Sequence, residues 1–290
     1  MVVAYPPGGT VDLLARAVGQ QLSRRWKQPV LVDNRPGGGA NIGTEFAARA
    51  PADGYTIFMS TVANVINISL YRKLNYDFRR DFIHVTHLAT VPGILVVHPS
   101  LPVKDVKGLI ALAKARPNEL RHGSSGTGSP HHLAGALFKS MAGVEMVHVP
   151  YKGASPAIND ILGGHIEVLF GAFVSTVPHV KTSRLRALGV TSIKRVPVAP
   201  DLPTLDEQGL SGFETASWFG VALPAGTPKD IAAKLHRELM QIISLPEVRD
   251  PFIAQGAEWI GSTPEEFAAF IEAQIAKWAK AVKASGATAG

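Results

Sequence analysis

The 290-residue sequence contains no cysteine, which excludes disulfide bonds, thiolate nucleophiles and cysteine-based zinc sites. No apolar run approaches the roughly 18 residues that a membrane-spanning helix needs. Charged residues make up only 18% of the chain, below the usual quarter. Glycine (28) and proline (21) are frequent instead, which predicts many tight connections.

The chain carries a net charge of +6, which favours an anionic partner through the overall field of the protein. Lysine and arginine are scattered, however, and no stretch has the basic clustering with interleaved aromatic residues that a nucleic-acid surface needs. We therefore expect no nucleic-acid partner.

Strand-like and helical runs alternate, which is typical of an α/β protein with largely parallel sheets. The pattern predicts strands at 2–5, 29–34, 55–60, 85–88, 93–98, 120–123, 145–149, 168–171 and 186–191. It predicts helices between them at 10–26, 43–50, 67–71, 106–115, 130–142 and 156–162.

The clearest predicted helix is the last one. Thr263 can cap it, Pro264 suits its first position, Glu266 completes a capping box, and Gly286 can end it. One face is apolar at helical spacing and is expected to be buried; it comprises Phe267, Phe270, Ile271, Ile275, Trp278 and Val282.

Two segments share a strand end, a proline-rich turn and a Lys-Asp pair that opens a helix: VVHPSLPVKDV (96–106) and VALPAGTPKDI (221–231). Two ordinary strand-to-helix connections would also explain the similarity. The alternative is a pair of crossing strands that join one lobe, residues 1–96 with 220–290, to an inserted lobe, residues 97–219.

Small residues precede two of the predicted helices, in YPPGGTVDLL (5–14) and HGSSGTGSPHH (122–132). The first N–H groups of a helix have no partner within it, and the helix dipole places positive partial charge there. Glycine lets a ligand approach such a helix start closely. We expect the two starts, one from each lobe, to face each other and bind a small anion without lysine.

Helix-capping residues support both starts. Gly8 and Gly9 leave N–H groups exposed before Thr10, while Ser129 is a good N-cap ahead of Pro130. A third segment, VPYKGASPAINDILGG (149–164), caps a helix in the same way, although a plain strand-to-helix connection would look alike.

Catalytic and nucleotide motifs are absent. The sequence has no G-x-S-x-G elbow and no P-loop, and His131 stands where a dinucleotide loop beginning at Gly126 would need its third glycine. His131 and His132 are adjacent, so on a helix they diverge, and one of them is expected to cap or pack locally. We expect no enzymatic activity, no metal and no cofactor; a hydrolytic α/β enzyme is the weakest alternative.

Seven motifs, in order, resemble the Bug/TctC family of extracytoplasmic receptors for tripartite tricarboxylate transporters. They are PPGGTVDLLAR, VDNRPGGGANIGTEFAARAPADGYT, SSGTGSPHHLAG, HVPYKGASPAINDILGG, LRALGVTS, PDLPTLDEQGL and FGVALPAGTP. The resemblance covers nearly the whole chain.

The resemblance implies a two-lobed periplasmic-binding-protein-like fold of type II, in which two crossing strands join lobes built on mainly parallel sheets flanked by helices. It implies a monomeric periplasmic receptor that binds a small organic acid, either a di- or tricarboxylate or an aromatic carboxylate, and delivers it to membrane permease subunits. A receptor that reports to a two-component sensor is the alternative. No signal-peptide pattern precedes residue 2, where family members begin several residues earlier after such a peptide, so the start is expected to reflect trimming.

The same resemblance implies the ligand site residue by residue. In the first lobe these are Pro7, Gly8, Gly9, Thr10, Asp12, Ser60, Thr61 and Asn64. In the second lobe they are Ser124, Ser125, Gly126, Gly128, Ser129, His132, Tyr151 and Lys152, and Gly171 and Ala172 are also predicted to contact the ligand.

One segment departs from the family pattern. FGAF (170–173) stands where many members carry an aspartate after the phenylalanine. Gly171 and Ala172 thus remove a carboxylate that could pair with an ammonium group, which predicts that the ligand is not an amino acid. Phe173 leaves room for an aromatic acid, unless it packs in the core.

Overall fold

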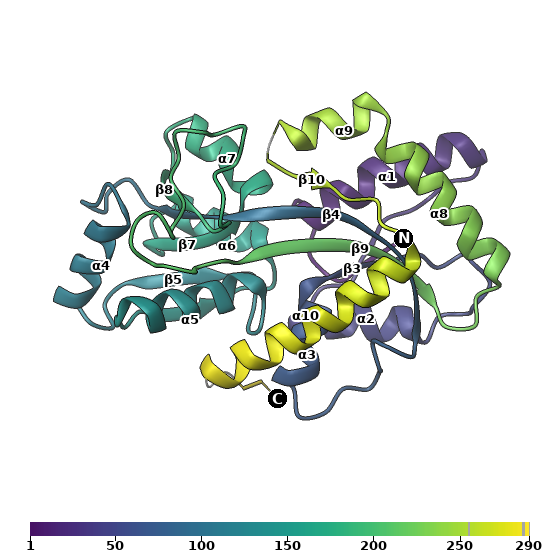
Figure 1. Ribbon diagram of the computed structural model, residues 1–290, viewed down its shortest axis with the longest axis horizontal. Helices are drawn as coiled ribbons and strands as arrows, with labels where there is room; N and C mark the ends of the chain where they lie inside the picture. The colour runs from purple at the N-terminus through teal and green to yellow at the C-terminus, as the bar shows by residue number, and fades with distance from the viewer. Residues whose placement is uncertain (255, 286–287, 290) are drawn as a thin grey trace.

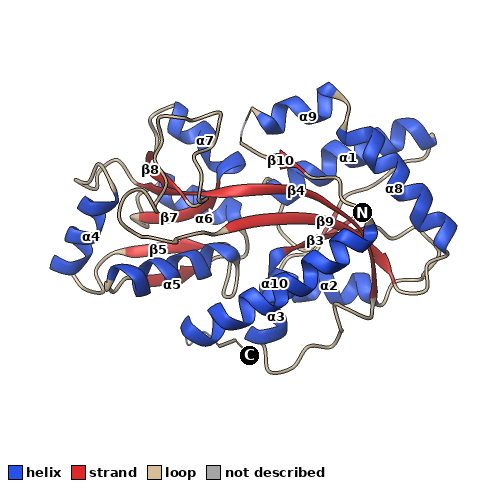
Figure 2. Cartoon of the chain, in the orientation of Figure 1, coloured by secondary structure: helices blue, strands red, loops and turns tan. Residues whose placement is uncertain are grey.

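The computed structural model describes residues 1–254, 256–285 and 288–289, so the predicted helix end at Gly286 lies outside the described residues. A pair of long strands, β4 (Phe82–Val97) and β9 (Ala216–Pro224), runs from one lobe into the other and joins them (Figure 1). Helices cover both sheets (Figure 2). This is the predicted two-lobed α/β architecture.

The first lobe is built on strands in the order β2–β1–β3–β9–β4, of which the first three are parallel. Its strands are β1 (Val2–Val3), β2 (Asp33–Asn34), β3 (Phe58–Thr61) and β10 (Glu258–Trp259), with parts of β4 and β9. Its helical segments are α1 (Thr10–Trp26), η1 (Gly38–Ala40), α2 (Asn41–Ala48), α3 (Val62–Leu70), α8 (Lys229–Ile243), α9 (Pro246–Ile253) and α10 (Pro264–Ser285).

The second lobe contains a parallel set, β7–β5–β6, onto which the far end of β4 packs antiparallel. Its strands are β5 (Arg121–Ser124), β6 (Val147–Pro150), β7 (Val168–Ala172) and β8 (Arg186–Val190). Its helices are α4 (Val106–Ala115), α5 (Pro130–Ala142), α6 (Ala154–Leu162) and α7 (Phe173–Lys181).

The crossing strands change partners at defined residues. Strand β4 pairs with β9 from Phe82 to Pro92 and with β7 from Gly93 onward. Strand β9 in turn pairs with β3 only from Phe219. The sequence predicted two separate strands at 85–88 and 93–98, which is wrong; Pro92 and Gly93 would normally interrupt a strand. Here they fall where one continuous strand passes between lobes.

Helices α1, α4 and α5 were predicted with their observed ends. Helix α6 begins at Ala154, two residues earlier than predicted, and Gly153 rather than Ser155 is its N-cap. Helix α3 begins five residues earlier than predicted, at Val62, because Thr61 and Asn64 form a capping box that the β-branched sequence had obscured. The predicted strand at 29–34 is reduced to Asp33–Asn34. Helices α7 and α9 were not predicted.

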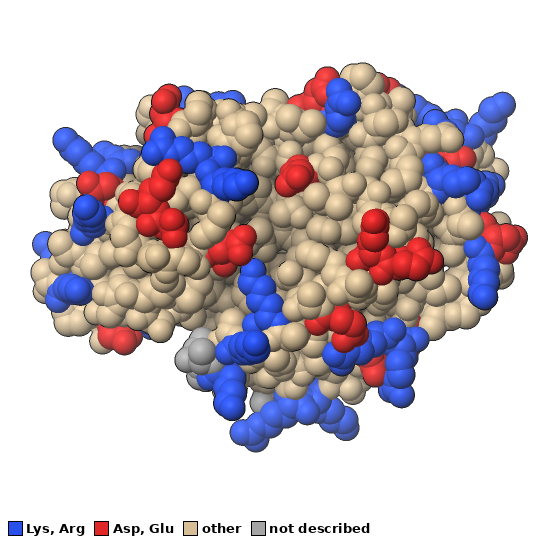
Figure 3. All heavy atoms as spheres, in the orientation of Figure 1, with Lys and Arg blue, Asp and Glu red and all other residues tan. Residues whose placement is uncertain are grey.

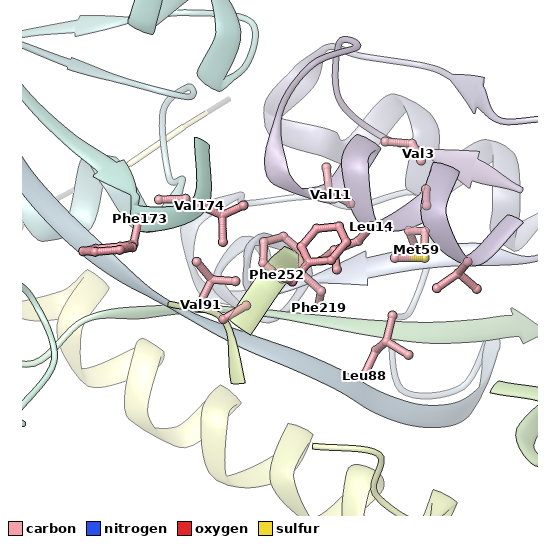
Figure 4. Close-up of a cluster of buried hydrophobic side chains, with 14 of the residues drawn as sticks. Val3, Val11, Leu14, Met59, Leu88, Val91, Phe173, Val174, Phe219 and Phe252 are labelled. Carbon is pink, nitrogen blue, oxygen red and sulfur yellow. The ribbon is translucent and has the colours of Figure 1, made fainter. Parts of the chain in front are cut away.

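One hydrophobic core cluster is continuous between the lobes. It includes Val11 and Leu14 of α1, Val91 and Phe219 of the crossing strands, and Phe173 of α7 (Figure 4). A second cluster lies under α10, where Phe267 and Trp278 are buried against the first-lobe sheet together with Leu133 of α5. No helix within the described ranges is both long enough and apolar enough to cross a bilayer.

Phe267 tests the expectation that α10 is part of the scaffold. Its side chain is fully buried, and a Cβ placed on Gly220 of β9 would lie only 2.2 Å from its ring. We expect Phe267→Ala to lower the free energy of unfolding by about 3–5 kcal/mol in urea titrations, because it leaves a cavity. The exposed neighbour Ala268→Ser should change it by less than about 0.5 kcal/mol. Equal effects would contradict the assignment of α10 to the core.

Candidate functional site

A small cavity lies between the lobes. Residues from both lobes and from β9 line it: Tyr5, Pro6, Gly9, Thr10, Val11, Thr61, Val62, Ser125, Pro130, His131, Ala154, Ala172, Ser217 and Phe219. Most of this wall is apolar, with polar groups at a few points.

Five helices begin at this cavity. The lining includes Gly9 and Thr61, the N-caps of α1 and α3, and Ala172, the N-cap of α7. It also includes the first residues of α5 and α6, Pro130 and Ala154. Because each helix start carries positive partial charge, the five together favour a negatively charged guest.

Several donors at these helix starts are unused. In the described part of the chain, nothing accepts a hydrogen bond from the N–H groups of Thr10, Val11 or His131. The Thr10 hydroxyl is buried and likewise has no partner among the described residues. Unpaired buried donors are costly unless a ligand satisfies them.

No lysine, arginine, aspartate or glutamate is among the described residues that line the cavity. Burial raises the pKa of Tyr5 to about 12 and lowers the pKa of His131 to about 4, so both are neutral near pH 7. On the face shown in Figure 3, basic and acidic side chains are interspersed. The positive potential that the described lining offers therefore comes from backbone dipoles at the helix starts.

The structure brings five of the predicted site residues to this cavity: Gly9, Thr10, Thr61, Ser125 and Ala172. Gly126, Tyr151 and Lys152 line a second cavity that shares Tyr5 and Ser125 with the first. Gly171 lines a third, narrow cavity beyond His131.

Asp12 holds the loop before α1 through hydrogen bonds. It accepts hydrogen bonds from Arg16 at 2.9 Å, from the N–H of Gly8 at 3.0 Å and from Asn34 at 2.9 Å. Burial alone would raise the pKa of Asp12, but these hydrogen bonds outweigh it and hold the pKa below its ordinary value. The carboxylate is thus already paired with the protein.

Ser60 and Asn64 lie outside the lining. Ser60 is buried beside Gly220, on the side of the sheet that Phe267 covers. Asn64 accepts a hydrogen bond from the N–H of Thr61 at 2.7 Å and donates one to Thr44 at 2.8 Å. Asn64 thus fixes the start of α3, whereas the Ser60 hydroxyl has no partner among the described residues.

The loop before α5 is held by its own polar groups. Ser129 accepts a hydrogen bond from the N–H of His132, and His132 Nδ1 accepts one from the N–H of Gly128 at 3.0 Å. Ser124 Oγ lies 2.6 Å from His148 Nε2. His132 is therefore the residue that caps locally, and His131 is the one that faces the cavity.

The two lobes touch beside the cavity. Ser155 Oγ donates a hydrogen bond to the carbonyl oxygen of Pro7 at 2.9 Å, across the gap between lobes. Gly128 has φ +76° and packs so closely on Leu70 that an added Cβ would lie 1.8 Å from Leu70 Cδ2. Only glycine fits there, and the lobes are in a closed arrangement.

The sequence left part of the lining unidentified: Tyr5, Pro6, Val11, Val62, Pro130, His131, Ala154, Ser217 and Phe219. Tyr5, Pro6 and Val11 flank the predicted first loop, and Ala154 belongs to the third capped segment, so proximity to a helix start could have found them. Ser217 and Phe219 come from β9, and no local signal marks them. Phe173 packs in the core and does not line the cavity.

Comparisons with known proteins agree with this architecture. The family model described as "Tripartite tricarboxylate transporter family receptor" (TctC) matches residues 14–287. Protein BugT of Bordetella pertussis is 35% identical over 289 residues, which cover 99% of this chain and 89% of BugT. A Pseudomonas sp. (strain P51) protein from the tcbD-tcbE intergenic region is 38% identical over 97% of this chain and 84% of its own length.

Solved structures are similar along almost the whole chain. Rpa4515 of R. palustris, solved with adipate, has a TM-score of 0.96 at 39% identity and covers 99% of this chain and 96% of its own. The periplasmic binding protein BugD has a TM-score of 0.96 at 32% identity, with 99% and 97% covered. MatC of Rhodopseudomonas palustris, with bound malate, has a TM-score of 0.92 at 27% identity, with 97% of both chains covered.

Three histidine rings stack behind the α5 loop. His132 and His148 have ring centroids 4.0 Å apart, and His148 and His122 have theirs 5.0 Å apart. Burial, with the neighbouring histidines and Lys139, lowers the pKa of His122 to about 3; the pKa of His148 is about 3 for the same reasons. In the described chain, no three potential ligands among His, Cys, Asp and Glu are grouped to hold a metal.

The stack makes stability sensitive to acid. Below pH 6.5 His122 binds a proton in the unfolded chain but stays neutral in the folded protein, because its folded pKa is about 3. The free energy of unfolding is therefore highest above pH 6.5 and falls as the pH falls toward 3. His122 alone should lower the free energy of unfolding by about 2 kcal/mol between pH 7 and pH 5. We expect His122→Leu to flatten the pH dependence of urea unfolding by about that amount, whereas the exposed His165→Leu should leave it unchanged. An unaltered slope in His122→Leu would contradict this origin of acid sensitivity.

Proposed function

Because the chain belongs to the TctC family of tripartite tricarboxylate transporter receptors, we propose that it binds a small organic acid in the cavity between its lobes and delivers the acid to membrane permease subunits of such a transporter. The family is one of solute-binding receptors and not of enzymes. A periplasmic location is part of the proposal and rests on the periplasmic proteins to which the chain is similar.

The observation that carries the proposal is the meeting of five helix starts at a cavity whose described lining has no cationic side chain. Hydrogen bonds to a charged group contribute about 1.5–3 kcal/mol each. Micromolar binding needs about 8 kcal/mol. Four or five donors, including those of Thr10, Val11 and His131, supply this after the cost of ordering the bound state is subtracted.

The ligand is an acid without an amino group. An ammonium group in the cavity would meet no carboxylate among the described lining residues, since Gly171 and Ala172 stand at that position and Asp12 is already paired. The apolar wall formed by Val62, Pro130 and Phe219 suits a hydrocarbon chain. The acids bound to similar proteins, adipate and malate, are dicarboxylates, and we place this ligand in that class.

Entry of the ligand requires the lobes to separate. Contacts such as Ser155 to Pro7 close one side of the cavity. Separation is proposed to occur by bending of β4 and β9 where they change partners, a hinge motion typical of two-lobed receptors. Bound acid would favour the closed arrangement because its oxygens pair with donors from both lobes.

A panel of succinate, malate, adipate, citrate and benzoate tests the proposal. We expect at least one dicarboxylate to raise the melting temperature and to bind with micromolar affinity by calorimetry, unchanged when recovered. Thr10→Val removes the buried unpaired hydroxyl with little change in shape and should weaken binding about tenfold or more.

The exposed Thr182→Val is the matched control and should bind as the wild type does. If all five acids leave the melting temperature and the calorimetric signal unchanged, organic-acid binding is refuted. Turnover of the acid would refute the receptor assignment.

A further inference from the structure

His131 is the one imidazole that faces the cavity among the residues that line it. It is the second residue of α5 and borders both the central cavity and the narrow cavity beyond it. Its Nδ1 lies 2.9 Å from Ser125 Oγ, while its Nε2 is buried and has no partner in the described chain. One nitrogen is thus held by the protein and the other is left for a guest.

Ser125 determines which nitrogen carries the proton when an anion is bound. A neutral imidazole has one donor and one acceptor nitrogen. The Ser125 hydroxyl can donate to Nδ1, which leaves the hydrogen on Nε2, the ring nitrogen that has no partner in the described chain. An acid oxygen in the cavity selects this tautomer, because the other would place a lone pair against a negative charge.

The ring is neutral before the ligand arrives. Burial lowers the pKa of His131 to about 4, and the positive end of α5 also disfavours a charged ring. Tyr5 is the other titratable side chain that lines these two cavities, and its pKa of about 12 keeps it protonated. Asp12 of α1 is paired with Arg16, and His132 of α5 binds the loop.

On the basis of the proposed function, we propose that His131 determines ligand specificity by donating a hydrogen bond from Nε2 to an oxygen of the bound acid. A buried donor of this kind rejects guests that have no acceptor at its position, since such guests leave it unpaired. Thr191, Thr215 and Ser217 line the narrow cavity together with Phe170 and Ala134, but in the described chain none of them forms a hydrogen bond with Nε2. The site therefore requires an oxygen at this point.

The first test compares three proteins against the same panel of five acids by calorimetry at pH 7. His131→Leu keeps bulk but has no donor, and we expect at least tenfold weaker binding of every acid that the wild type binds. His131→Gln carries an amide N–H close to the position of Nε2 and should recover most of the lost affinity. The exposed His165→Leu serves as the control for loss of a histidine.

The second test detects the proton. A bound carboxylate favours the charged imidazole, so it raises the pKa of His131 and makes the wild type take up more protons on binding at pH 5.5 than His131→Gln does. Calorimetry in two buffers of different ionisation enthalpy measures this difference, and protonation of the acid itself cancels between the two proteins. The stacked His122 and His148 are outside the cavity lining and are common to both.

The outcomes separate the two proposals. Binding by the wild type with equal affinity in His131→Leu and equal proton uptake in His131→Gln would overturn the role of His131 and leave the receptor function standing. Failure of the wild type to bind any of the five acids would overturn both.

Discussion

The proposed binding site depends on backbone N–H groups that the fold leaves unpaired at helix starts. Helices α1 and α5 supply such groups from opposite lobes, and α3, α6 and α7 begin at the same cavity. A buried donor without a partner raises the free energy of the folded state, so a ligand that supplies acceptor atoms to these groups gains binding free energy. An anion that enters supplies such atoms and meets the positive ends of several dipoles at once.

The residues around these helix starts keep the donors available. Asp12 holds the N–H of Gly8, and His132 holds that of Gly128, so both loops keep a fixed shape. Pro130 contributes no N–H at the first turn of α5 and leaves His131 as its first amide. Charged side chains that could fold into the cavity and occupy the donors are absent from its described lining.

Local chemistry explains what the sequence could predict. Helix caps and glycine loops are encoded within a few residues, so α1, α5 and the loops before them were predicted where they occur. The continuous β4 and the residues Ser217 and Phe219 depend on pairing between segments more than a hundred residues apart, which no local pattern encodes. His131 and His132 show most clearly what the sequence could not predict. The sequence indicated that His131 and His132 diverge, but the motif assigned His132 to the ligand, whereas packing turns His131 toward the cavity.

A site made of fixed dipoles behaves differently from one made of lysine or arginine. Tyr5 and His131 stay neutral near pH 7 because burial opposes their charged forms, so the field in the cavity does not depend on titration. A desolvated cation paired with the acid would bind it more strongly and would remain as a buried unpaired charge after the acid left. Dipoles leave no such charge, and the separation of the lobes can hydrate every donor at once. In the proposed function, the geometry that binds the acid therefore also allows its release, as delivery to permease subunits would require.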